Sequence, residues 1–279
     1  MNKSKYTCYL CGSINHRILE VITKKPEGEV DYGIVPEQYH RVVTQCQNCH
    51  VYTNQHDLLR QEMYAGDYNQ SISESDVQAS ISQRYDKVMS LPIDQSDNRG
   101  RVARIGAYFD NIGKDLSQSD ILDVGSGTCV FLGAIKGQVR STACIDPDAQ
   151  AVSHAINYVG VDMAHTGTLA DFGSSPLFDI ITFNKVLEHV LEPVAILKQA
   201  SRLLKDGGII YVELPEGDRT ATHGNIAQRQ EFFVEHYTIF NEPSYLALCQ
   251  RAGYQCQAVN IITEASGKLS IYGFLTQQK

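Results

Sequence analysis

Four cysteines of this 279-residue chain form two C-x-x-C pairs, Cys8/Cys11 and Cys46/Cys49. Two such pairs on tight turns can place four thiolates tetrahedrally around Zn²⁺ at about 2.3 Å per bond. Four thiolates fill the coordination shell, which indicates a structural metal; His50, next to Cys49, is an alternative ligand. Free thiols or a redox C-x-x-C motif are the other interpretations, but a redox motif needs one pair beside a βαβ unit. We therefore expect a zinc-binding domain over residues 1–60.

A glycine-rich turn follows the short apolar run ILDV. The run contains Asp123, and the turn Gly125-Ser126-Gly127 comes before a helix-like segment. Glycines let the backbone approach a ligand at the carboxyl end of a strand, where open α/β sheets bind their ligands. A dinucleotide fingerprint needs Gly or Ala at the sixth position, which is Val130 here. Binding of a pyrophosphate is therefore disfavoured.

A second carboxylate supports a nucleoside ligand. Asp146 closes the next strand-like run in ACIDPDA, nineteen residues after Gly127. A carboxylate at this place can accept both hydroxyls of a ribose. The alternative is a cap on the following helix, but Asp148 is better placed for that role. The two motifs together predict a nucleoside without a pyrophosphate.

The elements that position these residues alternate from residue 120 onwards. Apolar runs separated by helix-like segments predict a parallel sheet covered by helices on both faces. The last two strand-like runs have no helix between them, so we expect a hairpin at one sheet edge and a mixed sheet. We expect strands at 121–124, 141–146, 178–183, 208–215, 254–262 and 268–276, and helices at 76–91, 98–113, 129–137, 148–160, 193–208 and 242–253.

These motifs, in order, resemble the class I S-adenosylmethionine-dependent methyltransferases over about residues 98–276. The resemblance rests on D-V-G-S-G-T, the acidic end of the second strand, FDIITFNKVLEHV and LLKDGGIIYVELP. It implies a Rossmann-like α/β fold with a seven-stranded mixed sheet. It divides the chain into the zinc domain, a helical linker and active-site cover at 61–115, and an S-adenosylmethionine-dependent domain at 116–279.

The resemblance also implies how the donor is held. The glycine loop would hold the methionine part, Asp146 the ribose, and the backbone near Leu169–Asp171 the adenine. Asp123 would position the amino group, and Asn184 would line the sulfonium end. The implied donor-binding residues are Asp123, Gly125, Ser126, Gly127, Asp146, Pro147, Leu169, Asp171 and Asn184.

A four-cysteine zinc domain joined to this fold is similar to the sugar C-methyltransferases that act on nucleotide-linked deoxysugars. Their catalytic Glu-His pair precedes x-x-x-F, which matches Glu235 and His236 in EFFVEHYTIF, and a further histidine matches His189. Their Tyr-containing segment resembles YAGDYNQSIS (64–73), which implies that Tyr64 or Tyr68 contacts the acceptor. The chain departs from the pattern at Phe233, where those enzymes carry a tyrosine, and we expect it to lack their second α/β domain.

The catalytic expectation follows from the chemistry of methyl transfer. The donor is already activated, so the enzyme aligns the acceptor and removes a proton. A neutral imidazole suits that task. We expect His236, with Glu235 beside it in sequence, to be the base; His189 is the alternative. The acceptor is expected to be a small molecule, a sugar or nucleotide-linked sugar, while the methylated atom and the oligomeric state stay open.

Composition limits the other function classes. The formal charge is 24 − 32 = −8, and residues 1–60 carry seven basic and six acidic side chains, so no strongly basic footprint for nucleic acid is present. No run reaches the roughly 18 apolar residues that a membrane span needs. The N-terminal residues lack the apolar core of a signal peptide, so we expect a cytoplasmic protein. The alternatives are an RNA methyltransferase guided by the zinc domain and a non-catalytic nucleoside-binding module.

Overall fold

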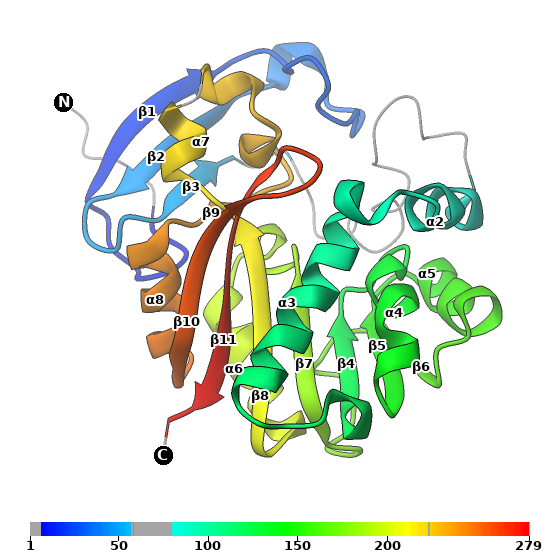
Figure 1. The fold of residues 1–279 in the computed structure, drawn as a ribbon. Coiled ribbons are helices and arrows are strands. Elements are labelled where there is room, and N and C mark those ends of the chain that lie inside the picture. Colours follow the sequence, from blue (N-terminus) through cyan, green and yellow to red (C-terminus); the bar gives the residue numbers. More distant parts are fainter. Residues whose placement is uncertain (1–6, 57, 59–79, 223, 279) are drawn as a thin grey trace.

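The structure, a computed structural model, describes residues 7–56, 58, 80–222 and 224–278 (Figure 1). Two β-sheets organise these residues. The larger has seven strands in the order β10-β11-β8-β7-β4-β5-β6, and the smaller has four in the order β1-β2-β3-β9. The predicted fold class, a Rossmann-like α/β fold with a seven-stranded mixed sheet, is confirmed.

The seven-stranded sheet is parallel from β8 to β6, and β11 runs antiparallel to both of its neighbours. The hairpin of β10 and β11 therefore lies at one sheet edge, as expected. The central strands are continuous apolar runs because helices cover both of their faces. In β7 only Asp179 and Asn184 are partly exposed. The strands are β4 (Asp120–Val124), β5 (Ser141–Asp146), β6 (Met163–Thr166), β7 (Phe178–Asn184), β8 (Leu204–Pro215), β10 (Tyr254–Thr263) and β11 (Leu269–Gln277).

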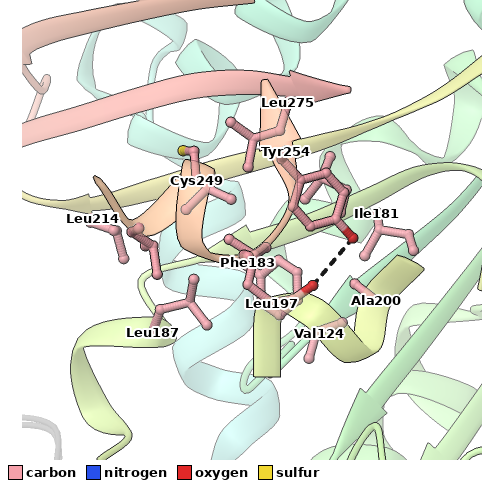
Figure 2. Close-up of a cluster of buried hydrophobic side chains, with 14 of the residues drawn as sticks. Val124, Ile181, Phe183, Leu187, Leu197, Ala200, Leu214, Cys249, Tyr254 and Leu275 are labelled. Atoms are coloured by element: carbon pink, nitrogen blue, oxygen red, sulfur yellow. Dashed lines mark hydrogen bonds between the residues drawn. The ribbon is translucent and has the colours of Figure 1, made fainter. Parts of the chain in front are cut away.

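The helices cover the sheet in two layers. Helices α3 (Asp97–Asn111) and α4 (Val130–Ile135) contribute to the core on one face, together with the π-helical turn Ala155–Val159 that follows α5 (Ala149–His154). Helices α6 (Pro193–Gln199) and α8 (Glu242–Arg251) contribute to the core on the other (Figure 1). Figure 2 shows part of this second core, where the Tyr254 hydroxyl donates a 3.2 Å hydrogen bond to the Leu197 carbonyl. Helix α2 (Ile81–Met89) packs against α4 and α5.

The chain differs from the expected helix at 193–208. Helix α6 ends at Gln199, a 3₁₀ turn spans Ala200–Leu203, and β8 begins at Leu204. The Lys205 ammonium contacts Asp120 and Asp179 at 2.7 and 2.8 Å, which ties the start of β8 to the neighbouring strand ends. The short polar strand β6 also lies outside the expected elements, because its run MAHT lacks an apolar pattern.

The four-stranded sheet combines the N-terminal residues with a distant segment. Its strands are β1 (His16–Ile22), β2 (Arg41–Cys46), β3 (Tyr52–Gln55) and β9 (Thr238–Ile239). Strand β9 pairs with β3 and comes from the stretch between β8 and α8, which also contains α7 (Asp218–Thr222). The predicted domain boundaries at residues 60 and 115 stay predictions, and this sheet reaches beyond the first of them. Within the described residues, no helix is long and apolar enough to cross a bilayer.

Candidate functional site

The four cysteines of the C-x-x-C pairs form one cluster beside the end of β2. The Sγ atoms of Cys8 and Cys49 are 3.6 Å apart, and those of Cys11 and Cys46 are 3.5 Å apart. All four Sγ atoms lie within 4.8 Å of one another. Tetrahedral ligands at about 2.3 Å from Zn²⁺ are about 3.8 Å from each other. The residues present therefore fit a zinc ion.

The turns of the two pairs support thiolate ligands. The backbone N–H of Cys11 donates to Cys8 Sγ at 3.5 Å, and that of Asn48 donates to Cys46 Sγ at 3.4 Å. His50, the alternative ligand, is not part of the described cluster. Its backbone has a φ of 63°, so it forms the left-handed turn after the second pair.

Three polar side chains predicted to bind the donor lie at the carboxyl ends of neighbouring strands. Asp123 is near the end of β4, Asp146 ends β5 and Asn184 ends β7. The Thr182 hydroxyl and the Asn184 side-chain amide donate to Asp123 Oδ1 at 2.6 and 2.9 Å. Burial raises the pKa of Asp123 to about 6. The buried Oδ1 of Asn184 has no hydrogen-bond partner, so it can take a ligand donor.

The glycine turn needs its glycines. Gly125 has a φ of +71°, and a Cβ there would lie 2.8 Å from the Val186 side chain. The backbone N–H groups of Gly127 and Asp148 donate to the two carboxylate oxygens of Asp146 at 2.8 and 2.9 Å. These bonds fix the carboxylate, and each oxygen keeps a second lone pair for a hydroxyl.

The other predicted donor residues belong to the loops after β4, β5 and β6. The loop after β6 is tied to β5, because the Gly167 N–H donates to the Asp146 carbonyl at 2.9 Å. Asp171 Oδ2 accepts two hydrogen bonds from Thr168, which shape this loop. The sheet therefore brings the predicted donor set to one edge, including Ser126, exposed Pro147, buried Leu169 and exposed Asp171.

A cavity of about 600 Å³ adjoins the loop that follows β7. Five segments distant in sequence line it, together with Pro215 at the end of β8: 28–30, 88–101, 185–189, 230–236 and 266–269. The described parts of the N-terminal unit, the helical segment and the methyltransferase-like core all contribute to its wall. The cavity is thus a pocket that forms only in the folded chain.

The two candidate bases, predicted as alternatives, lie in this cavity together. The rings of His189 and His236 have centroids 4.6 Å apart. Each Nδ1 faces a backbone carbonyl, that of Glu235 at 3.0 Å and that of Glu231 at 2.9 Å. Because a carbonyl only accepts, each Nδ1 carries the hydrogen, and Nε2 is the unprotonated nitrogen of the neutral ring. The hydrogen bond from His236 Nδ1 goes to the backbone carbonyl of Glu231.

Burial keeps both rings neutral. It lowers the pKa of His189 to about 4 and that of His236 well below its usual value. Burial also raises the pKa of the Glu235 carboxyl to about 7. Neutral imidazoles can accept a proton or coordinate a metal ion.

A third side chain, Glu188, joins the histidines and was not anticipated. Its side chain is fully buried, and neither carboxylate oxygen has a hydrogen-bond partner. Its Oε1 lies 4.0 Å from His189 Nε2. Burial raises the pKa of Glu188 to about 8. The sequence contains the dipeptide Glu188-His189, but no local pattern around it indicates that the glutamate side chain is buried.

A buried charge network supports the wall of the cavity from α3. Arg101 donates to Glu213 Oε1 at 2.6 Å, and Arg104 donates to Glu213 Oε2 at 2.6 Å and to Glu264 at 3.3 Å. The Lys185 ammonium donates to the Ser270 hydroxyl at 2.6 Å. The Lys185 backbone has a φ of 59°, which places a strained non-glycine residue directly after Asn184.

The N-terminal sheet holds the segment that carries His236. The Asn54 side-chain amide lies 3.1, 3.2 and 2.8 Å from the carbonyls of Phe232, Phe233 and His236. Arg41 donates to the Phe232 carbonyl at 2.6 Å. Neither Asn54 nor Arg41 was predicted, because contacts across about 180 residues leave no local pattern. Tyr64 and Tyr68, predicted to contact the acceptor, lie outside the described residues.

Comparison with known proteins agrees with this geometry. The methyltransferase domain family matches residues 95–259. The ubiquinone biosynthesis O-methyltransferase of Nitrosomonas europaea is 25% identical over 114 residues, which cover 37% of this chain and 47% of that protein. The enzyme of the same name from Glaesserella parasuis is 29% identical over 117 residues, covering 38% and 49%. The chain thus spans about half the length of the curated relatives it matches.

Solved structures share the fold. The Burkholderia thailandensis 1,6-didemethyltoxoflavin-N1-methyltransferase, with bound 1,6-didemethyltoxoflavin and S-adenosylhomocysteine, aligns with a TM-score of 0.51 at 16% identity, covering 86% of this chain and 96% of that one. The Synechocystis PCC 6803 magnesium protoporphyrin IX methyltransferase with bound S-adenosylhomocysteine aligns with a TM-score of 0.52 at 14% identity, covering 73% and 97%. The family match extends over more than half of the 279 residues. The chain therefore belongs to the methyltransferase domain family, with the fold of class I S-adenosylmethionine-dependent enzymes.

Proposed function

We propose that the protein transfers a methyl group from S-adenosylmethionine to a sugar or a nucleotide-linked sugar. One observation carries this proposal: the predicted donor residues and the cavity meet at the end of β7. Asn184 ends the strand on the donor side, Lys185 and His189 line the cavity, and Val186 between them packs against the glycine turn. A methyl group at the Asn184 end of a donor would thus face the cavity.

The donor would be held by groups that the fold already fixes. Asp146 would accept the ribose hydroxyls through its remaining lone pairs, and Asp123 would attract the ammonium of the methionine part. The unpartnered Oδ1 of Asn184 would take a donor from the bound ligand or a polarised C–H near the sulfonium. The backbone near Leu169–Asp171 would border the adenine. When bound, S-adenosylmethionine supplies an already activated methyl group.

The acceptor would occupy the cavity. Gln95, Asn98 and Gln230 of its wall can hydrogen-bond hydroxyl groups, which supports an acceptor of the sugar type. Val88 and Leu91 can pack against the apolar face of a ring. His236 removes the acceptor proton in this proposal, and His189 is the alternative base. Burial lowers the pKa of both rings, so each imidazole is in the neutral form that a base requires and is a weaker base than a free imidazole.

Zinc binding by Cys8, Cys11, Cys46 and Cys49 is the second part of the proposal. The sulfur separations and the N–H···S bonds of the two turns support it. The ion would be structural, because four thiolates leave no open position. Its role would be to hold the end of β2, and through this sheet the segment 230–240.

Mass spectrometry of methyl transfer tests the acceptor class. Purified protein is offered S-adenosylmethionine with a panel of nucleotide-linked sugars, and with a ubiquinone biosynthesis intermediate because the curated relatives bear that name. Methylation within the sugar panel is expected. His236→Asn should lower turnover by about 10²–10⁴-fold while donor affinity is kept, which is the usual loss of a general base. Methylation of the ubiquinone intermediate alone would contradict the sugar acceptor.

His189→Asn serves as the matched variant in the same cavity. A mild loss in His189→Asn beside a severe loss in His236→Asn assigns the base to His236, and the reverse assigns it to His189. If both variants stay within about threefold of the wild type, the acceptor needs no protein base, and transfer is driven by proximity.

A further inference from the structure

The described residues contain two groups of Cys, His, Asp or Glu side chains whose ligand atoms, at least three in each group, lie within 4.8 Å of one another. One group is the cysteine cluster. The other consists of Glu188, His189 and His236. We propose that these three residues hold one divalent cation between the loop after β7 and the segment 230–236. His189 and His236 are also the candidate bases of the methyl-transfer proposal, which does not itself require a cation.

The gap between two of these side chains has the size of a shared ion. Glu188 Oε1 and His189 Nε2 are 4.0 Å apart, which is too long for a hydrogen bond. Two ligand atoms, each at about 2.1 Å from one ion, lie between about 3 and 4.2 Å apart. The separation therefore leaves room for an atom between the oxygen and the nitrogen.

The Glu188 carboxyl is the group at this place that needs a binding partner. It is fully buried, and neither of its oxygens has a hydrogen-bond partner. Leaving a buried polar group unsatisfied is costly, and buried carboxylates in proteins are paired or bound to metals. A cation at this place satisfies the carboxylate directly.

The histidines are oriented as metal ligands. Their Nδ1 atoms are bound to the carbonyls of Glu235 and Glu231, so the hydrogen of each neutral ring is on Nδ1. Metal-binding histidines have such a partner on the second nitrogen, because it fixes the tautomer and the ring plane. Lys185, in the same loop, is already held by Ser270 at 2.6 Å and lies 3.9 Å from Glu213.

The donor set selects the class of ion. Two imidazoles and one carboxylate suit first-row divalent ions such as Mn²⁺, Fe²⁺, Co²⁺ and Zn²⁺. All three residues line the cavity, so the remaining coordination positions face the space proposed for the acceptor. There the cation would bind acceptor oxygens and lower the pKa of a bound hydroxyl. This role, unlike cation binding itself, rests on the proposed methyl transfer, and it would replace direct proton removal by the imidazoles.

Binding of Mn²⁺ to the zinc-loaded protein tests the proposal. Electron paramagnetic resonance measures free Mn²⁺, and Mn²⁺ prefers oxygen and nitrogen ligands over the soft thiolates of the cysteine cluster. We expect one Mn²⁺ per chain in the wild type. Glu188→Gln and His236→Asn should each weaken binding by more than about tenfold, since loss of an outer-shell partner alone costs 10- to 100-fold. Glu192→Gln, an exposed carboxylate just beyond the same loop, should bind as the wild type does.

Absence of saturable Mn²⁺ binding in the wild type would overturn the site and leave a water as its occupant. Binding that is equal in Glu188→Gln, His236→Asn and Glu192→Gln would overturn it as well. S-adenosylhomocysteine affinity, measured on the same samples, separates this test from the methyl-transfer proposal. Donor binding without Mn²⁺ binding would contradict the cation site alone. Mn²⁺ binding without donor binding would contradict the methyl-transfer proposal alone.

Discussion

Replacing Asn54 with alanine should loosen the segment that carries His236 without touching the donor residues. Asn54 is fully buried on β3, and its amide faces the carbonyls of Phe232, Phe233 and His236. Its Oδ1 accepts from Arg41 at 2.8 Å. The side chain therefore links the N-terminal sheet to one wall of the cavity.

The expected loss of stability follows from the hydrogen bonds that the Asn54→Ala substitution removes. The amide has two hydrogens, and with the Oδ1 acceptor it makes about three hydrogen bonds, each with a net contribution of about 0.5–1.5 kcal/mol. Asn54→Ala should thus lower the free energy of unfolding by about 2–4 kcal/mol. A displacement of the His236 ring by about 1 Å would lower turnover by up to about 100-fold. S-adenosylhomocysteine affinity should stay unchanged, because the donor residues belong to other loops.

Chemical unfolding, steady-state turnover and calorimetry with S-adenosylhomocysteine measure the three quantities. Gln55→Ala is the matched control. Within the described residues, the side-chain amide of the neighbouring Gln55 donates its hydrogen bond to the Thr53 hydroxyl of the same strand. Equal turnover in folded Asn54→Ala and folded Gln55→Ala would contradict the proposed role of Asn54. A loss of donor affinity in Asn54→Ala as large as its loss of turnover would contradict it as well.

Two further predictions concern the cysteine cluster and the donor site. Cys46→Ser should remove zinc and lower turnover, because zinc binding contributes folding free energy to the sheet that holds 230–240; Cys256→Ser, outside the cluster, should keep both. Elemental analysis and turnover check this, and full zinc content in Cys46→Ser would contradict it. Burial raises the pKa of Asp123 to about 6, so this carboxyl is protonated below that pH and cannot attract the donor's ammonium. S-adenosylhomocysteine affinity should therefore fall as the pH drops through about 6, and calorimetry of Asp123→Asn showing the same pH dependence would contradict this assignment.

Local sequence patterns predicted the larger sheet well for a physical reason. Parallel strands buried on both faces are continuous apolar runs, and the glycines of the turn at Gly125 mark where the backbone has a positive φ and Val186 approaches closely. The close packing of the four cysteines was predicted from their spacing in the same way. The edge hairpin of β10 and β11 was predicted from the missing helix between them.

The rest depends on contacts that local patterns cannot show. Strand β9 has two residues and exists because β3 lies beside it. In the sequence Glu188 looks like any surface glutamate, but its side chain is fully buried in the fold. The bond from Arg101 to Glu213 joins residues 112 apart, and no periodicity encodes such a pair. Because of such contacts, the two candidate bases, which were predicted as alternatives, lie together in one cluster.

Calorimetric titration with S-adenosylhomocysteine tests the central claim most directly, that the ends of β4, β5 and β7 hold a nucleoside donor. One molecule should bind per chain, and NAD should not bind. Asp146→Ala removes the ribose acceptor and should cost about 1–3 kcal/mol, or about 5- to 150-fold in affinity. Asp110→Ala, an exposed aspartate on α3, should bind as the wild type does. Equal affinity in Asp146→Ala and Asp110→Ala, or tight binding of NAD, would contradict the account.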